Sequence, residues 1–169
     1  MDLSLTGTGW CLWGSEYNYD SGLIEPSKLE GMARLGFILS EIQKVLDIGG
    51  ENQNPTESLV VIEDFSFASK GSSLFQIAGL GYLVRYNLYT AGIQFVLVPP
   101  TVLKKFVAGK GGVEKSVMIK EVFKHWGFDT NDDNVADAYG LARIGRSLLG
   151  WDTEQLVGYQ KEALKQLEK

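Results

Sequence analysis

Hydrophobic and polar positions follow two different periods along the chain, and the changes of period divide it into predicted elements. Residues 5–24 are typical of antiparallel strands joined by tight turns, with the turn-prone pair Gly14-Ser15 between them. Two unbroken apolar runs, Leu59–Ile62 and Phe95–Val98, are typical of strands buried on both faces of a sheet that helices cover. The first run ends at Glu63, and a proline pair stops the second.

Other segments carry hydrophobic residues at helical spacing. The first expected helix extends from Pro26 to Leu46. Further helices are expected over Ser72–Leu88, Val113–Trp126 and Val135–Leu149, and the last over Thr153–Leu167. Within the second of them, Gly79 and Gly81 allow close packing. Strands first, followed by alternation of helix and strand, predict an α/β fold with a mixed sheet flanked by helices. Because we find no repeat and no interdomain linker, we expect one domain over residues 1–169.

The composition limits the chemistry that this chain can perform. Hydrophobic residues make up 44% and charged residues 22%, as in an ordinary globular protein with a core. One cysteine, Cys11, excludes a disulfide framework and a thiolate metal cluster, and one histidine, His125, nearly excludes a His-rich metal site. We expect Cys11 to be buried and His125 to have a packing or surface role. Carboxylates must therefore perform most of any catalysis.

The cysteine usage and the hydropathy also predict where the protein acts. A single cysteine is typical of a reducing cytoplasm, which we take as the expected location. No apolar run approaches the roughly 18 residues of a membrane span, so we expect no membrane partner.

The net charge of −5 argues against nucleic-acid binding by the chain as a whole, because phosphate contacts need lysine and arginine. The charge is unevenly distributed, however. Residues 1–64 carry three basic and eleven acidic side chains, whereas residues 101–126 carry six lysines and two glutamates, a net charge of +4. The basic segment is either a solvated helix face or a surface that follows a polyanion.

Three acidic residues are notable for their positions. Asp2 opens a strand-like segment, Glu63 ends a buried strand, and Asp137 lies in a small apolar turn of a predicted helix. Asp133 and Asn134, four and three residues earlier, share a helical face with Asp137. Oxygen ligands of this kind suit Mg²⁺, and paired ions can hydrolyse phosphodiesters without histidine or cysteine. The alternative interpretation is that these acids are solvated charges and helix caps.

Asp132, which precedes this helix, is expected to act only as its N-terminal cap.

Taken in order, these residues resemble the RuvC-type Holliday-junction resolvases of the RNase H-like superfamily. The resemblance covers roughly residues 2–150. Its most specific parts are Asp-Asn-Val-Ala-Asp-Ala at 133–138, which is similar to a phage-type variant, and Val-Glu-Lys-Ser at 113–116 after a glycine-rich turn. The resemblance implies an RNase H-like fold with a five-stranded mixed sheet. It also implies a homodimer that nicks two opposed strands of a four-way DNA junction with Mg²⁺, for which Mn²⁺ is a plausible substitute.

The resemblance also implies the catalytic and metal-binding residues. Asp2 matches the family's first-strand aspartate, Glu63 the glutamate after the middle strand, and Asp137 the last aspartate of the closing helix. The other closing-helix aspartate of the family falls on Asn134. Either Asp133 substitutes for it or Asn134 binds the metal through its amide oxygen.

The DNA-binding residues are implied in the same way. Lys104 and Lys115 fall where family members keep lysines near the scissile phosphate, and Lys115 is expected to take part in catalysis. Phe67 lies near an aromatic residue that is similar to a wedge at the junction centre. The remaining expected DNA contacts are Lys70, Lys105 and Lys110.

The chain departs from the family pattern in ways that keep other functions open. Relatives can carry a histidine farther along the closing helix, where this chain has residues 144–146, Ile-Gly-Arg. Only Met1 precedes Asp2, so we expect further residues upstream to complete the first strand. The alternatives are a ribonuclease that cuts RNA–DNA hybrids and a non-catalytic junction-binding protein, which Asn134 and the acidic balance favour.

Overall fold

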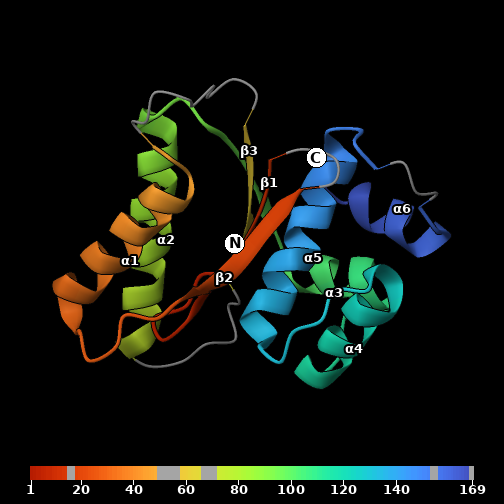
Figure 1. The fold of residues 1–169 in the computed structure, drawn as a ribbon, viewed down its shortest axis with the longest axis horizontal. Helices are drawn as coiled ribbons and strands as arrows, with labels where there is room; N and C mark the ends of the chain where they lie inside the picture. Colours follow the sequence, from red (N-terminus) through yellow and green to blue (C-terminus); the bar gives the residue numbers. More distant parts are fainter. Residues whose placement is uncertain (15–17, 49–57, 66–71, 153–155, 168–169) are drawn as a thin grey trace.

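The computed structural model describes residues 1–14, 18–48, 58–65, 72–152 and 156–167, which form a sheet layer between two groups of helices (Figure 1). Phe67 and Lys70 lie outside these described residues. In chain order the elements are β1 (Thr8–Trp13), β2 (Tyr19–Ile24), α1 (Gly31–Val45), β3 (Leu59–Glu63), α2 (Ser72–Thr90), β4 (Gln94–Val98), α3 (Pro100–Ala108), α4 (Lys115–Trp126), α5 (Asp133–Leu148) and α6 (Gly158–Leu164).

The described strands form an antiparallel pair, β1–β2, and a parallel pair, β3–β4. The N-terminal residues lie between the two pairs and bond to both. Asp2 forms an antiparallel bridge with Gly9 of β1, while the Met1 ammonium donates to the Val61 carbonyl at 2.6 Å. The Glu63 amide donates to the Met1 carbonyl at 3.0 Å. Residues 1 and 2 therefore connect the two strand pairs.

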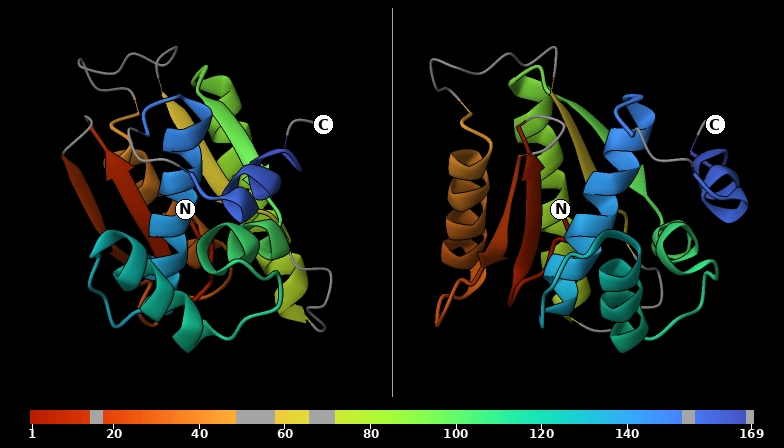
Figure 2. Two further views of the ribbon diagram at one scale, coloured as in Figure 1. Left: turned by 90° about the vertical axis from the view of Figure 1, so that its right-hand side faces the viewer. Right: turned by 45° about the vertical axis from the view of Figure 1, so that its right-hand side comes forward.

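Helices cover both faces of the strands, as the unbroken apolar runs predict. Helices α1 and α2 lie together on one side, and α3, α4 and α5 lie on the other (Figures 1 and 2). Along β3, Val60 and Ile62 pack into the core of α1 and α2, whereas Val61 packs into the core of the other helices. This alternation explains why the strand has no polar position before Glu63.

The helix predicted to begin at Pro26 begins five residues later, at Gly31. Ser27 adopts a left-handed conformation with φ of 53°, and the Leu29 amide donates to the Pro26 carbonyl in a turn. This conformation cannot continue a right-handed helix, so hydrophobic spacing alone placed the start too early.

Helix α3 was not predicted, because the Pro99-Pro100 pair suggested an irregular connection after β4. Pro100 is instead the first helical residue, where the missing amide hydrogen costs nothing and the fixed φ favours the helix. The helix ends at Gly109, whose φ of 76° suits a residue without a side chain. Lys104 and Lys105 consequently lie on a helix.

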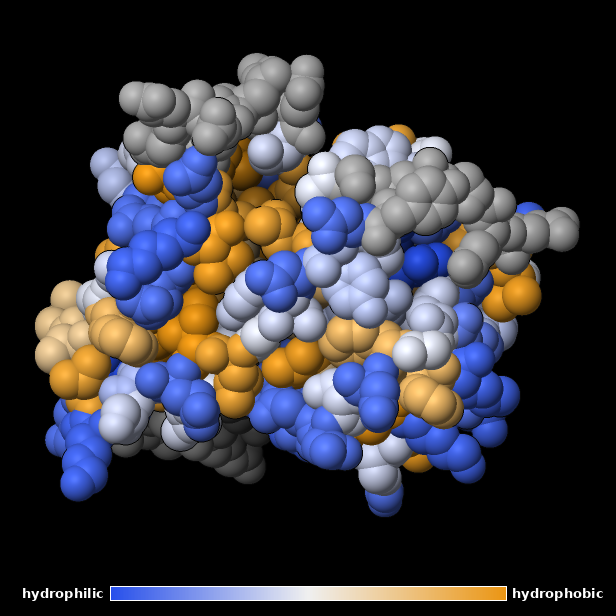
Figure 3. Space-filling view, in the orientation of Figure 1, coloured by the Kyte–Doolittle hydropathy of each residue, from blue (hydrophilic) through white to orange (hydrophobic). Residues whose placement is uncertain are grey.

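The remaining predicted elements are confirmed with small shifts of their ends. The last helix is shorter than expected and begins at Gly158. On the face drawn in Figure 3, hydrophobic residues show between the α1–α2 pair and the β1–β2 strands, and hydrophilic residues cover α1 and α4. None of the helices in the described ranges is long and apolar enough to cross a membrane.

Candidate active site

A close contact between α5 and β1 brings the N-terminal part of the chain beside a helix from its second half. A side chain at Gly9 would place its first carbon 2.0 Å from the Asn134 carbonyl oxygen, so only glycine allows α5 to pack on the strand here. Gly9 is also the bridge partner of Asp2. The contact thus carries Asp137, one turn along α5 from Asp133, toward Asp2.

Gly9 was not singled out by its sequence pattern. A glycine inside a predicted strand often marks close approach of another backbone, and this signal was available in the sequence.

Asp2, which is buried, and Glu63, which is half-buried, form an acidic pair at the junction of the two strand pairs. Asp2 is 8% exposed. Burial raises the pKa of Asp2 well above its usual range, and the charge of Glu63 and a hydrogen bond with it raise the pKa further. Burial likewise raises the pKa of Glu63, although its hydrogen bond with Asp2 acts in the opposite direction. Burial therefore disfavours the ionised form of both carboxyls.

Asp137 belongs to the same cluster. Burial, followed by the charges of Asp2 and Asp133, raises the pKa of Asp137 to about 7. The charge of Asp137 also raises the pKa of Glu63. Its Oδ1 atom is buried without a hydrogen-bond partner among the residues that the structure describes. The acids predicted from the start, middle and end of the chain thus lie close enough to oppose one another's ionisation.

Two of the predicted lysines face this cluster. Lys115, the first residue of α4, pairs with Asp133, and this hydrogen bond raises the pKa of Lys115. Its side chain is 73% exposed, so the pair is worth at most about 1 kcal/mol and Lys115 can leave it for another anion. The charge of Lys104 on α3 lowers the pKa of both Glu63 and Asp137, which places it beside the acids.

The neighbouring residues of α5 have different contacts. Asp132 is the N-terminal cap, as predicted, and accepts a hydrogen bond from the Val135 amide at 3.0 Å. The side-chain nitrogen of Asn134 lies 3.4 Å from the position where a side chain at Gly7 would begin, so the amide group rests against the loop before β1. Asp133, by contrast, contributes charge to the cluster.

The residues fit a hard divalent cation by their chemistry. They supply carboxylate oxygens, one of them buried without a partner, in a site where burial and mutual repulsion disfavour ionisation. A cation would relieve both effects. In the conformation described, and for the described residues only, no three Asp, Glu, His or Cys side chains surround one point as ligands. An ion would bind the ionised form of these carboxylates, so protons would be released when it binds.

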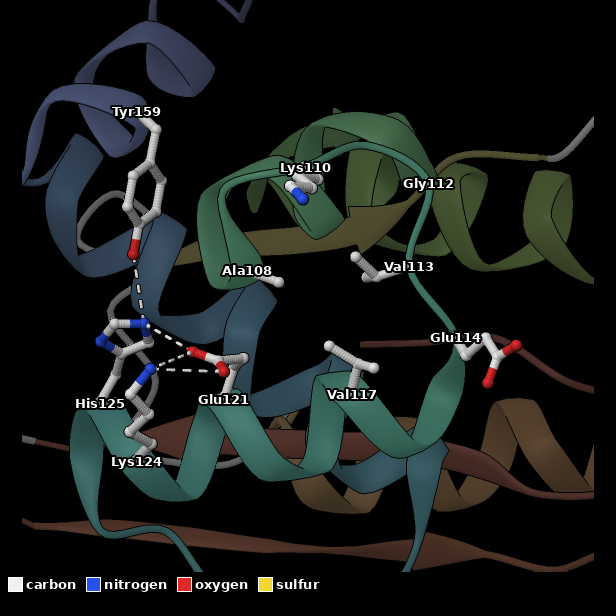
Figure 4. A pocket seen from close by; sticks show the side chains of 10 residues that line it. All are labelled: Ala108, Lys110, Gly112, Val113, Glu114, Val117, Glu121, Lys124, His125 and Tyr159. Atoms are coloured by element: carbon white, nitrogen blue, oxygen red, sulfur yellow. Dashed lines mark hydrogen bonds and ion pairs between the residues drawn. The ribbon is translucent and has the colours of Figure 1, made fainter.

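The other predicted DNA contacts lie farther along the basic segment. Lys105 pairs with Glu162 of α6 at 2.9 Å, so this lysine joins α3 to the C-terminal helix. Lys110 is exposed and lines a groove of about 730 Å³ that α4 and α6 border (Figure 4).

In this groove, the His125 Nε2 atom lies 3.3 Å from the Glu121 Oε2 atom and 3.2 Å from the Tyr159 hydroxyl oxygen. Its contacts are those of the packing residue that we expected. Cys11 is partly buried, and burial raises the pKa of its thiol to about 12, so it has no nucleophilic character.

The structure is an α/β fold in which acidic residues from three parts of the chain gather beside the strands. No family model matches the chain. Two curated relatives, both named crossover junction endodeoxyribonuclease RuvC, are 27% identical to it. That of a Synechococcus species aligns over 136 residues, 78% of this chain and 80% of the relative. That of Brachyspira hyodysenteriae aligns over 124 residues, 73% of this chain and 74% of the relative.

Solved structures give the same result for the fold. Thermus thermophilus RuvC has a TM-score of 0.61 at 18% identity, covering 88% of this chain and 93% of that structure. The same protein in complex with a Holliday junction substrate has a TM-score of 0.62 at 20% identity, covering 85% and 93%. These similarities confirm the predicted resemblance to the RuvC-type resolvases.

Proposed function

We propose that this protein is a metal-dependent, structure-selective DNA endonuclease that resolves four-way junctions by nicking phosphodiester bonds. The observation that carries the proposal is the cluster of Asp2, Glu63 and Asp137, three acids far apart in sequence whose ionisation is mutually opposed. The two RuvC relatives and the RuvC complex with a Holliday junction support the choice of substrate.

Asp2, Glu63 and Asp137 would hold one or two Mg²⁺ ions. When bound, the ions supply an activated water and positive charge for the departing oxygen. We propose Asp133 as the fourth acidic group, because its charge acts on Asp137 whereas the Asn134 amide rests against the loop before β1.

Lys115 and Lys104 provide positive charge on the open side of the acids. Lys115 is the more exposed of the two and pairs with Asp133, so a phosphate can take the place of that carboxylate. It would then neutralise charge that develops on the scissile group. Lys105 and Lys110 extend the basic surface away from the site, and they would bind the DNA backbone.

We also propose how the two strand pairs combine into one sheet. We infer that residues 1 and 2 form part of the central strand of one mixed five-stranded sheet. Their hydrogen bonds to Val61 and Glu63 on one side and to Gly9 on the other support this order, β2–β1–residues 1–2–β3–β4. Central placement explains why Asp2 is buried next to Glu63. The sheet and its helices would constitute one nuclease domain over residues 1–169.

Two opposed cuts call for two sites related by a two-fold axis, and the outer face of α2 offers a surface for such a dimer. The core face of α2 carries Leu80, Val84 and Leu88. The opposite face carries four aromatic side chains that are 67–81% exposed: Phe75, Tyr82, Tyr86 and Tyr89. An outward helix face is normally charged, so these aromatic residues indicate a partner.

A second copy of the chain is the partner that we propose. An aromatic side chain can bury roughly 150–250 Å² of surface, so the four exposed rings offer roughly 600 Å² of contact surface per copy. This is close to the ~800 Å² that each partner buries in a standard interface. Among the described residues of α2, Arg85 is the charged one, and its side chain is only 14% exposed and paired with Asp64, so pairing of this face with itself brings little like charge together. We propose that the protein acts in the cytoplasm, which its single cysteine favours.

The test is incubation of the purified protein with labelled four-way junction, fork, flap and RNA–DNA hybrid, each with Mg²⁺, Mn²⁺ or EDTA. We expect paired nicks in the four-way junction with either metal and none with EDTA. Cleavage of the hybrid alone would assign a ribonuclease instead. Junction binding without cleavage in any metal would assign a non-catalytic binding protein.

A further inference from the structure

Arg85 of α2 is bonded to the residue that follows Glu63. Its Nη2 atom donates to the Asp64 Oδ1 atom at 3.0 Å, and the Asp64 backbone amide donates to the Val98 carbonyl of β4 at 2.8 Å. The same Oδ1 atom accepts a hydrogen bond from the Phe65 amide at 2.9 Å. The Arg85 side chain is 14% exposed, so this ion pair is better shielded from water than an ordinary surface pair.

Phe65 completes the same arrangement. The Arg85 guanidinium carbon lies 4.6 Å from the centre of the Phe65 ring and 5.4 Å from that of Tyr82. The Phe65 ring also rests directly on the α2 backbone, because a side chain at Gly81 would begin 2.1 Å from it. Phe65 is therefore held by two contacts, one with Gly81 of α2 and one with the Arg85 guanidinium over its ring.

These contacts join the end of β3 to α2. Strand ends are where backbone pairing stops and fraying begins, and Glu63 is the last residue of β3. The Glu63 amide donates to the Met1 carbonyl, and directly after Glu63 the chain is held by the contacts of Asp64 and Phe65. The position of a metal-binding side chain must be fixed within a few tenths of an ångström. Contacts with neighbouring groups have to provide this constraint.

We propose that Arg85 is a positioning residue for Glu63: through Asp64 and Phe65 it fixes the end of β3 and so the direction of the Glu63 carboxylate. The proposal rests on the proposed function, since it assigns Glu63 to the metal site. Arg85 itself does not touch the acids that would hold the ion. Its effect should therefore appear in metal affinity and in the rate of cutting, with junction affinity little changed.

The experiment compares the full-length protein with its Arg85→Met and Arg85→Lys variants in two measurements. Mn²⁺ binding without DNA is followed by electron paramagnetic resonance, and junction cleavage gives kcat and KM. We expect Arg85→Met to weaken Mn²⁺ binding and lower kcat by about tenfold or more, as loss of a group that orients a ligand does. KM should stay within about twofold of wild type, since Arg85 is not expected to contact DNA.

Arg85→Lys keeps the charge but not the planar group that lies over Phe65, so it should recover part of kcat and of the Mn²⁺ affinity. Arg34→Met is the matched control: Arg34 lies on α1 and donates to the Leu29 carbonyl. This control should bind Mn²⁺ and cut like wild type. All assays are run well below the lowest melting temperature of the set.

A double-mutant cycle with Asp64→Asn keeps the proposal falsifiable if one variant folds poorly. Arg85→Met and Asp64→Asn break the same ion pair, so the double variant should lose no more kcat than the worse single variant. Additive losses would overturn the proposal, as would wild-type Mn²⁺ binding and kcat in an Arg85→Met protein that merely melts earlier. If wild type itself neither binds Mn²⁺ nor cuts junctions, the proposed function fails and the assignment of Arg85 fails with it.

Discussion

Replacing Asp137 with asparagine should stabilise the metal-free protein while abolishing its activity. Burial and the charges of Asp2 and Asp133 raise the pKa of Asp137 from its usual 3.8 to about 7. Between these two pH values the folded chain holds a proton that the unfolded chain has released. The free energy of unfolding consequently falls as pH rises through this window, and the full cost is present above about pH 7.

The size of the effect follows from the shift. About three pKa units correspond to about 4 kcal/mol at pH 8, an upper value because a folded chain can relax around a charge. At pH 4.5 only about 1 kcal/mol of this cost is present. Asp137→Asn removes the charge at every pH, so its stabilising effect should be larger at pH 8 than at pH 4.5 by up to about 3 kcal/mol.

Urea denaturation of both proteins in EDTA at the two pH values measures this difference directly. The melting temperature gives a second measure, and a gain of about 3 kcal/mol corresponds to roughly 6–12 °C for a chain of this size. Added Mg²⁺ should stabilise wild type more than the variant, because the variant has lost a ligand. An equal effect at pH 4.5 and pH 8, or a variant less stable at pH 8, would refute the electrostatic reasoning.

Four further predictions concern DNA and assembly. Glu63→Gln should abolish cleavage but keep junction binding by gel shift; retained cutting would remove Glu63 from the metal site. Lys115→Ala should lower kcat by about tenfold or more with little loss of affinity, and wild-type affinity should fall linearly with salt on logarithmic axes. A salt-independent affinity would contradict phosphate contacts. Tyr86→Glu should give monomers in analytical ultracentrifugation, whereas Gln76→Glu, elsewhere on α2, should remain dimeric.

Most of the fold could be predicted because its signals are local. The unbroken apolar runs at Leu59–Ile62 and Phe95–Val98 gave β3 and β4, and each is now seen between two helical layers. The errors arose where backbone conformation decides the outcome. Hydrophobic spacing could not show the left-handed Ser27, and a proline pair reads as a stop although Pro100 suits the first turn of α3.

The candidate site was less accessible to sequence reasoning, because its residues meet only through long-range packing. The acids could be named from the resemblance, but not the contacts that gather them. Those contacts depend on Gly9, which allows α5 onto β1, and on the bridge between Gly9 and Asp2. The pairing of Asp133 with Lys115 and the Arg85–Asp64 ion pair join separate elements, so no spacing rule predicts them.

The raised pKa values also explain why folding and metal binding should be coupled in this protein. Burial and neighbouring acids disfavour the ionised form of Asp2, Glu63 and Asp137, yet only the ionised form binds a hard cation. Loading must then release protons, and metal affinity should rise with pH up to about pH 7, where Asp137 ionises. The repulsion between these carboxylates lowers the stability of the metal-free protein. A doubly charged ion should therefore stabilise the protein strongly, since one ion neutralises several carboxylates at once. Glu63 stands at the centre of this balance, because the charges of Asp137 and Lys104 act on it in opposite directions.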